Sequence, residues 1–308
     1  MDNGQWTIDN GRMASDELQK RILFIVNPIS GIGRQKAVER LIEARLDKDR
    51  FNISIAYTNA PGHATDISRK AAADGVEIVV AVGGDGTVNE TAAGLVDSET
   101  ILAIVPAGSG NGLARHLKIP MNLKRAIDVI NMGRILKIDT ATMNDQLFVN
   151  VAGVGFDAAV AKKFALAGKR GFSTYLRITT NSYKQYEPKQ YTLIIDGKVI
   201  KRRALLISFA NSSQFGNNTS IDPSASVSDG YIDVCIVGKV PFWKTFFLGP
   251  LLFMKKFDQT KYVEIIHAKE VILKRKKGKN VHLDGDPKIM GKELTMKINP
   301  ASLKVVVP

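Results

Sequence analysis

The sequence predicts an α/β protein of two domains. The first is an N-terminal domain with a parallel sheet and helices on both faces, and the second is a mainly β, sandwich-like C-terminal domain. Strand-like and helix-like segments alternate through the first half of the chain, which is typical of a parallel sheet covered by helices. Glycine-rich loops follow three of those strands. The second half holds many short β-like runs beside Asp-Gly turns, which favours a sandwich.

Each element of the first half follows from the spacing of its apolar residues. Strands are expected where short apolar or alternating runs end at turn residues: 22–26, 51–58, 78–82 and 101–105. Helices are expected where apolar residues recur every three or four positions: 37–46, 64–74, 88–96 and 123–132. The run at 78–82 is wholly apolar and indicates a buried strand.

The second half is expected to be built from short strands. These are predicted at 147–151, 191–195, 204–210, 231–237, 262–266, 270–274 and 294–298. Asp196-Gly197, Asp229-Gly230 and Asp284-Gly285 lie between or beside them as turn signals. We therefore predict a flexible tail over residues 1–20, an α/β domain over 21–140 and a β-sandwich-like domain over 141–308.

The net charge of the chain limits the classes of partner that it is expected to bind. Lys and Arg number 43 against 30 Asp and Glu, a net charge of +13 that attracts anionic membranes, phosphorylated ligands or nucleic acid. No zinc finger or aromatic RNP stretch is present, so nucleic acid is not the expected partner. The N-terminus lacks the pattern of a signal peptide, and Cys235 is the one cysteine, which together favour a cytoplasmic location.

One apolar segment stands out in the second half. Residues 242–257 are rich in aromatic side chains and are flanked by lysines. The run is too short to span a bilayer and is interrupted by Lys244, Gly249 and Pro250. Two interpretations remain open, an interfacial element that lies on a membrane and a buried connecting helix.

Three loops of the first half have the composition of phosphate-binding loops. They are Asn27-Pro28-Ile29-Ser30-Gly31, Gly83-Gly84-Asp85-Gly86-Thr87 and the stretch 106–112. Glycine turns that open a helix present backbone N–H groups to a phosphate, and three at the carboxyl ends of one sheet predict a shared crevice. Asp85 repels phosphate and instead indicates management of metal, water or a hydroxyl. None of the loops is a Walker A motif or a dinucleotide fingerprint.

The ordered set Asn-Pro-x-Ser-Gly, Gly-Gly-Asp-Gly-Thr-x-Asn-Glu and Pro-x-Gly-Ser-Gly-Asn resembles the diacylglycerol kinase catalytic family, which includes bacterial lipid kinases, sphingosine kinases and ceramide kinases. The likeness continues through the segments 150–157, 223–230 and 283–286, so it covers roughly residues 20–308. Gly-Gly-Asp-Gly alone is shared with NAD kinases and phosphofructokinases, whereas the full set is more specific. The resemblance implies a fold of the NAD kinase and diacylglycerol kinase type.

The resemblance also implies transfer of phosphate from ATP to a lipid hydroxyl, with the α/β domain binding nucleotide and the β domain binding lipid. Asp286 stands where the family has Glu and is the implied proton acceptor, with Asp284 as its competitor. Asp85 would anchor the network around the transferred phosphate. The positions that match ATP-binding residues are Asn27, Pro28, Ser30, Gly31, Thr58, Gly83, Gly84, Asp85, Gly86, Thr87, Asn89, Glu90, Gly108, Ser109 and Asn111.

A Mg²⁺ site in the second domain is implied as well, from Ser226, Asp229 and the carbonyl of Tyr231. Mg²⁺ prefers carboxylate, carbonyl and water ligands, and bacterial relatives often have an acidic residue in place of Ser226. The alternative for Asp229-Gly230 is a plain hairpin turn. A further departure is Gly112, which stands where diacylglycerol kinases usually have Asp.

The expected partner is a lipid acceptor at an anionic membrane surface, reached by peripheral association, and similar proteins suggest a homodimer. The acceptor is left open among diacylglycerol, sphingoid bases, ceramides and polyprenol- or glycerol-type lipids. Two other hypotheses stand beside the lipid kinase. One is an NAD kinase-like enzyme, and the other is a nucleotide-binding regulator without turnover, motivated by Ser226, Gly112 and Asp286.

Overall fold

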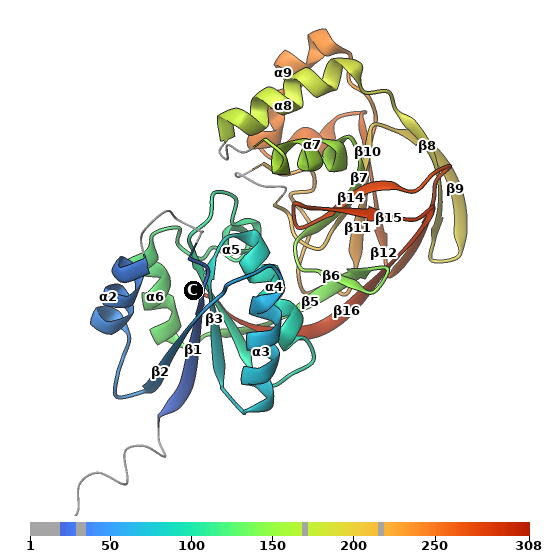
Figure 1. Cartoon of the computed structure of the whole chain (residues 1–308). Helices are drawn as coiled ribbons and strands as arrows, with labels where there is room; N and C mark the ends of the chain where they lie inside the picture. Colours follow the sequence, from blue (N-terminus) through green and yellow to red (C-terminus); the bar gives the residue numbers. More distant parts are fainter. Residues whose placement is uncertain (1–18, 29–34, 168–171, 215–218) are drawn as a thin grey trace, which may run out of the picture.

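The computed structural model describes residues 19–28, 35–167, 172–214 and 219–308. Within these residues the strands form two sheets, and helices gather around the first sheet and at the far end of the second domain (Figure 1). A parallel α/β domain is followed by an antiparallel β domain, so the predicted fold class is confirmed. No helix in the described part is both long enough and apolar enough to cross a membrane.

The N-terminal domain is a parallel sheet in the order β2-β1-β3-β4. Its strands are β1 (Lys20–Val26), β2 (Phe51–Tyr57), β3 (Ile78–Gly83) and β4 (Ile101–Pro106). Helices α2 (Gln35–Arg45) and α6 (Leu123–Met132) lie on one face, and α3 (His63–Ala73) and α4 (Asp85–Leu95) on the other (Figure 1). Every residue of β3 is buried because both faces of the sheet are covered. The short α5 (Gly112–His116) follows β4.

Helix α6 shows how local signals fix an element. The side chain of Asn122 accepts a hydrogen bond from the Arg125 N–H, which satisfies one of the free amides at the helix start. Gly133 ends the helix in the left-handed conformation, with φ of 67°. The predicted range 123–132 is therefore the observed one.

The C-terminal domain packs two layers of antiparallel strands against each other. β8 (Lys189–Ile195), β9 (Lys198–Ala204) and β13 (Glu270–Lys274) extend the first sheet. The second sheet runs β12 (Val263–Ala268), β11 (Ile232–Val237), β10 (Leu206–Ala210), β7 (Val151–Gly155), β14 (Lys279–Leu283) and β15 (Asp286–Met290). Phe148 and Leu193 from one layer meet Phe209 and Val234 from the other in a buried core, which is the predicted sandwich.

Helical segments cover one end of this domain, at the top of Figure 1. They are α7 (Phe156–Ala165), α8 (Phe172–Gln185), α9 (Thr245–Phe253) and the 3₁₀ turns η1 (Phe242–Lys244) and η2 (Phe257–Gln259). α7 and α8 were not predicted from the sequence. Apolar residues of both helices pack against β10 and β11 in a separate core. Only part of each helix is apolar, so the helical pattern in the sequence is weak.

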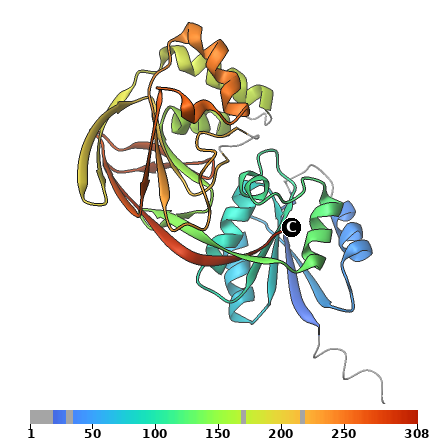
Figure 2. The ribbon, with the colours of Figure 1, turned by 180° about the vertical axis from the view of Figure 1, so that it is seen from behind.

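Two long strands join the domains, as both views of the ribbon show (Figures 1 and 2). β16 (Glu293–Val306) pairs antiparallel with β13 at its start and parallel with β4 at its end. β5 (Ile135–Met143) runs beside it throughout, with a shift in register between Asn299 and Leu303. The end of the chain therefore completes the N-terminal sheet, and the predicted boundary at 140 falls inside β5.

Two local expectations were wrong. The strand expected at 147–151 is divided between β6 (Gln146–Phe148) and β7, because the backbone N–H groups of residues 149–151 bond a side chain instead of a neighbouring strand. Asp229-Gly230 is not a hairpin turn, since it precedes β11 in a loop that follows no strand of the described residues directly.

Candidate active site

The loops after β1, β3 and β4 meet at the carboxyl ends of their strands, as the parallel sheet requires. The Asn27 amide donates to the Thr87 hydroxyl at 3.2 Å, which joins the first loop to the second. The second and third loops touch through glycines: a Cβ on Gly108 would lie 2.5 Å from the Cα of Gly84. Side chains at this contact would separate the loops. Ser30 and Gly31 lie outside the described residues.

The N-terminus of α4 lies in the middle of these loops. Gly84 caps the helix, and the first N–H groups of a helix have no partner within it. Gly86 is exposed, and a Cβ placed on it would meet no atom within 4 Å. Ser109 on the neighbouring loop is exposed too. Free amides, the helix dipole and open space together suit a phosphate group.

Thr58 and Asn111 support the loops from behind. Thr58 is buried, and its N–H donates to the Val26 carbonyl at the end of β1. Asn111 is buried in the left-handed conformation, with φ of 54°. Its amide donates to the Gly108 carbonyl at 2.8 Å and accepts from the Gly108 N–H at 3.2 Å. Both residues therefore shape the loops from inside the protein.

Asp85 binds the third loop. Its carboxylate accepts the N–H of Asn111 at 2.9 Å and that of Gly112 at 2.6 Å. Burial raises the pKa of the Asp85 carboxyl, while these hydrogen bonds and the nearby Arg115 guanidinium act in the opposite direction. Within the protein, Asp85 acts as a clamp between the second and third loops.

Sequence reasoning missed Arg115. It lies on α5, and its Nε donates to the Gly110 carbonyl at 2.9 Å, which places the guanidinium at the third loop. A cation here can offset the charge of a bound phosphate. The signal in the sequence was a single basic residue a few positions after a glycine-rich loop, a pattern too common to single it out.

Asn89 and Glu90 point to different partners from consecutive positions of α4. The Glu90 carboxylate accepts the Ala64 N–H at 3.3 Å, and its carbonyl accepts the Thr65 hydroxyl at 2.8 Å, so Glu90 binds the start of α3. The Asn89 amide donates to the Asp284 carboxylate at 2.7 Å, across the domain boundary. Asn89 thus ties α4 to the turn between β14 and β15.

The structure distinguishes Asp284 from Asp286. The Asp284 carboxylate accepts from Asn89 and from the backbone N–H groups of Val149, Asn150 and Val151, the last three at 2.9 Å. Burial raises its pKa, and these four bonds oppose that rise. A carboxylate held in this way is a structural anchor.

Asp286 opens β15 on the other side of a tight hairpin turn. Asp284 and Gly285 have φ of 49° and 89°, the pattern of a two-residue turn that favours Asp-Gly. The Asp286 side chain is 72% exposed, and the Lys288 ammonium lies 3.9 Å from its carboxylate. Its carboxylate can therefore approach a substrate, whereas that of Asp284 is already engaged.

A second contact between the domains involves α5. His116 and Ser213 are joined through imidazole Nδ1 and the hydroxyl at 2.9 Å, and burial lowers the pKa of His116. Gly112 packs on Asn150, so that a Cβ there would lie 2.5 Å from the Asn150 amide nitrogen. That nitrogen donates to the Gln214 carbonyl at 2.8 Å. The family's Asp has no room at position 112.

The residues implied for a Mg²⁺ site do not fit one well. Asp229 accepts the N–H of Tyr231 at 3.1 Å, and the Ser226 hydroxyl accepts the N–H of Ser228 at 3.3 Å. Lys269 places its ammonium 5.4 Å from the centre of the Tyr231 ring. In the described part of the chain no three His, Cys, Asp or Glu side chains cluster as metal ligands. This site stays a prediction.

Buried Asp139 organises the same loop and was also missed. Its carboxylate accepts the N–H of Gly230 and that of Ala301, each at 2.7 Å. It thereby ties the loop to the irregular part of β16. Nothing in the sequence distinguishes this Asp from the exposed ones, because its burial depends on how β5 and β16 cross between the domains.

An acidic cluster lies beside this loop. Asp222 and Asp233 are buried, and Asp233 bonds the imidazole of His267. Burial and the Asp222 carboxylate raise the pKa of Asp233 to about 7, while Asp233 raises the pKa of His267. The raised pKa of Asp233 thus has two physical causes, its burial and a neighbouring buried carboxylate.

The fold and the site define a two-domain protein. Glycine loops suited to a phosphate lie in the first domain, and an accessible carboxylate lies in the second. Residues 21–143 match the model of the diacylglycerol kinase catalytic domain. Residues 150–307 match that of the YegS C-terminal NAD kinase beta sandwich-like domain. The chain therefore belongs to the diacylglycerol kinase catalytic-domain family, a family of lipid kinases.

Known proteins that are similar to this chain support the same family. A diacylglycerol kinase from Staphylococcus aureus (strain JH9) is 27% identical over 89% of this chain and 88% of its own length. One from Staphylococcus carnosus (strain TM300) is 26% identical over 82% and 83%. The crystal structure of a diacylglycerol kinase from Bacillus anthracis str. Sterne matches with a TM-score of 0.72 at 21% identity, covering 94% of this chain and 97% of that one. A likeness at that identity shows the fold alone.

Proposed function

We propose that this protein transfers the γ-phosphate of ATP to a hydroxyl group of a membrane lipid, of the diacylglycerol or sphingoid type. Membership of a lipid kinase family supports the reaction class. The observation that carries the proposal is the bond between Asn89 and Asp284, because it holds the β14–β15 turn beside a helix whose N-terminus suits a phosphate.

Simple chain geometry puts the two parts of the site within reach of each other. Asn89 lies one helical turn, about 6 Å along the axis, from Asp85 at the start of α4. Asp286 is two residues from Asp284, so their Cα atoms are at most about 7 Å apart. The Asn89–Asp284 contact therefore brings Asp286 to the side of α4 that faces the C-terminal domain.

Each part then has a role in phosphoryl transfer. The N–H groups at the start of α4 bind phosphate oxygens, and Arg115 offsets their charge. Mg²⁺ would accompany ATP and neutralise charge on the transferred phosphate. Asp286 accepts the proton of the lipid hydroxyl as that oxygen attacks the γ-phosphorus. Asp284, Asn89 and Asp85 hold the two domains and the loops in register.

The test is a phosphotransfer assay with radiolabelled ATP and Mg²⁺ against a lipid panel in anionic mixed micelles, with NAD as a second acceptor. We expect label on a lipid. Label on NAD alone would assign the NAD kinase-like activity instead. ATP binding without any transfer would support the regulator.

Asp286→Asn tests the assignment of the base. We expect kcat to fall by about 10²–10⁴, the usual contribution of general base catalysis, with an unchanged urea midpoint because the side chain is exposed. Glu293→Gln is the matched control, since it removes another exposed carboxylate, one that pairs with Lys274 at the surface. A kcat for Asp286→Asn equal to that of the control contradicts the assignment.

A further inference from the structure

The cap of the C-terminal domain exposes a set of large apolar side chains. We call it the aromatic face, and it consists of Phe242, Trp243, Phe246, Phe247, Phe253 and Met254. Phe246 and Phe247 are each 75% exposed and Trp243 is 65% exposed. No residue of η1 or α9 is buried. Clustered apolar exposure on this scale marks an interaction surface.

The aromatic face is held on a packed support. Leu248, Leu251 and Leu252 on the other side of α9 contact the core beneath the cap. The Leu252 carbonyl accepts the N–H of Ser220 at 3.1 Å, which anchors the helix to the loop before β11. α9 thus carries apolar residues on both its packed side and its exposed side. A helix that is apolar all round is usually buried in apolar surroundings. The protein supplies those surroundings on one side only.

Lysines surround the aromatic face. Residues 239–257 contain four lysines and no acidic residue. The Lys244 ammonium lies 4.8 Å from the centre of the Trp243 ring, and Lys184 of α8 lies 4.6 Å from that of Phe242. Glu187, an acidic residue beside this surface, pairs with Lys239 at 2.6 Å. The surface is therefore apolar at its centre and cationic around it.

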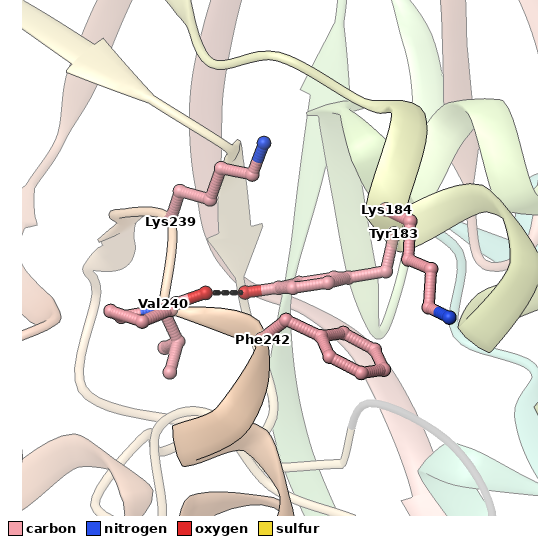
Figure 3. A pocket seen from close by; sticks show the side chains of 6 residues that line it. Tyr183, Lys184, Lys239, Val240 and Phe242 are labelled. Carbon is pink, nitrogen blue, oxygen red and sulfur yellow. Dashed lines mark hydrogen bonds between the residues drawn. The ribbon is translucent and has the colours of Figure 1, made fainter.

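A cavity of about 520 Å³ adjoins the aromatic face (Figure 3). It is lined by Tyr183, Lys184, Lys239, Val240, Pro241 and Phe242. The Tyr183 hydroxyl donates to the Val240 carbonyl at 2.6 Å, so these two polar groups of the cavity wall satisfy each other. Apolar walls with two lysines repeat the chemistry of the surrounding surface.

We propose that η1 and α9 dock this protein on an anionic lipid bilayer, with the aromatic face among the headgroups and the lysines against acidic lipids. Aromatic side chains favour the membrane interface, and clustered lysines bind its negative surface. This inference rests on the proposed function, since it names the surface from which the lipid acceptor is drawn.

Charge decides between a bilayer and a second copy of the chain. Two aromatic faces in contact would bring the lysines of both copies together, and like charges in an interface oppose association. An anionic bilayer offers an apolar interior and opposite charge at once. The net charge of +13 attracts the whole protein to the same surface.

The experiment is flotation with vesicles in the absence of nucleotide. One vesicle preparation contains phosphatidylcholine alone, and the other contains phosphatidylcholine and phosphatidylglycerol in equal parts. We expect binding to the anionic vesicles and at least about tenfold weaker binding of the double variant Phe246→Ser/Phe247→Ser. The double variant Lys244→Gln/Lys255→Gln should lose about fivefold for each charge removed.

The matched control is Met132→Ser/Val199→Ser, which removes two apolar side chains that are 62% and 64% exposed on other elements. It should bind like the natural protein. Equal binding of all variants to anionic vesicles overturns the proposal. So does a self-associated natural protein that the Phe246→Ser/Phe247→Ser change dissociates without any effect on vesicle binding.

A soluble short-chain diacylglycerol separates this inference from the proposed function. The aromatic-face variants should phosphorylate it at the natural rate and lose activity only on vesicle-borne lipid. Vesicle binding without any kinase activity would contradict the proposed function and leave the docking surface standing. Kinase activity on the soluble lipid without vesicle binding would contradict the docking surface and leave the proposed function standing.

Discussion

The side-chain amide of Asn89 donates a 2.7 Å hydrogen bond to the carboxylate of Asp284, and so joins α4 of one domain to the β14–β15 turn of the other. Three backbone N–H groups at residues 149–151 bind the same carboxylate. One side chain thus fixes the end of β6, the start of β7, the hairpin that carries Asp286 and the helix at the phosphate loops.

Asp284→Asn should destabilise the protein. The introduced amide nitrogen is a donor, and it would face N–H groups that now donate to the carboxylate. We expect the free energy of unfolding to fall by about 2 kcal/mol or more, the range for buried donors left without acceptors. Urea denaturation followed by circular dichroism measures this. Asp286→Asn serves as the control with an unchanged midpoint. Equal midpoints for both variants would show that Asp284 is no anchor.

Asp85→Asn should open the clamp between the second and third loops. A neutral amide offers one acceptor where two N–H groups, those of Asn111 and Gly112, are bound now. We expect turnover to be lost, ATP binding to weaken at least about tenfold and the free energy of unfolding to fall by about 1–3 kcal/mol. Calorimetric titration with ATP tests the binding. Asp66→Asn, an exposed carboxylate on α3, should behave as the natural protein does.

Gly112→Ala should destabilise the protein because a Cβ would lie 2.5 Å from the Asn150 amide nitrogen, which is already bonded to Gln214. We expect a loss of about 1–3 kcal/mol, the usual cost of overpacking, and a larger loss for Gly112→Asp. Thermal denaturation measures both. Gly291→Ala is the control, since a Cβ there meets no atom within 4 Å. An unaffected Gly112→Asp would mean that the family's Asp does fit.

Stability should fall as pH rises from about 4 to about 7. Asp233 has a pKa of about 7 in the folded protein against 3.8 as an ordinary carboxyl, so the folded state holds the extra proton in that window. The raised pKa of His267 acts in the same direction, but only as pH rises above its ordinary value of 6.5. Asp222→Asn should weaken the pH dependence of the urea midpoint between pH 5 and pH 8, because it removes a carboxylate charge that helps to raise the pKa of Asp233.

The control for this pH dependence is Asp229→Asn, which removes a nearby exposed carboxylate that acts on His267 and does not raise the pKa of Asp233. Its midpoint should follow the natural pH dependence. A pH dependence that survives unchanged in Asp222→Asn would show that the Asp222 carboxylate does not raise the pKa of Asp233.

The N-terminal domain was the more predictable half. Its strands and helices are local, and the spacing of apolar residues places 123–132 and the wholly buried β3 correctly. The C-terminal domain was harder, because α7 and α8 are only partly apolar and because the backbone at 149–151 bonds Asp284 instead of a strand. A side chain from a turn more than a hundred residues later cannot be read from the local pattern.

For the site, the sequence by itself determined the three glycine loops, the family and the two carboxylates near the C-terminus, since chain order and residue type are enough to define a motif. Only the tertiary structure decided what each residue does. Burial and hydrogen bonding turn Asp284 into an anchor and leave Asp286 exposed. They also give Asp139 and Asn150 structural roles, because their contacts join strands and loops that are distant in the sequence and meet only in the folded protein.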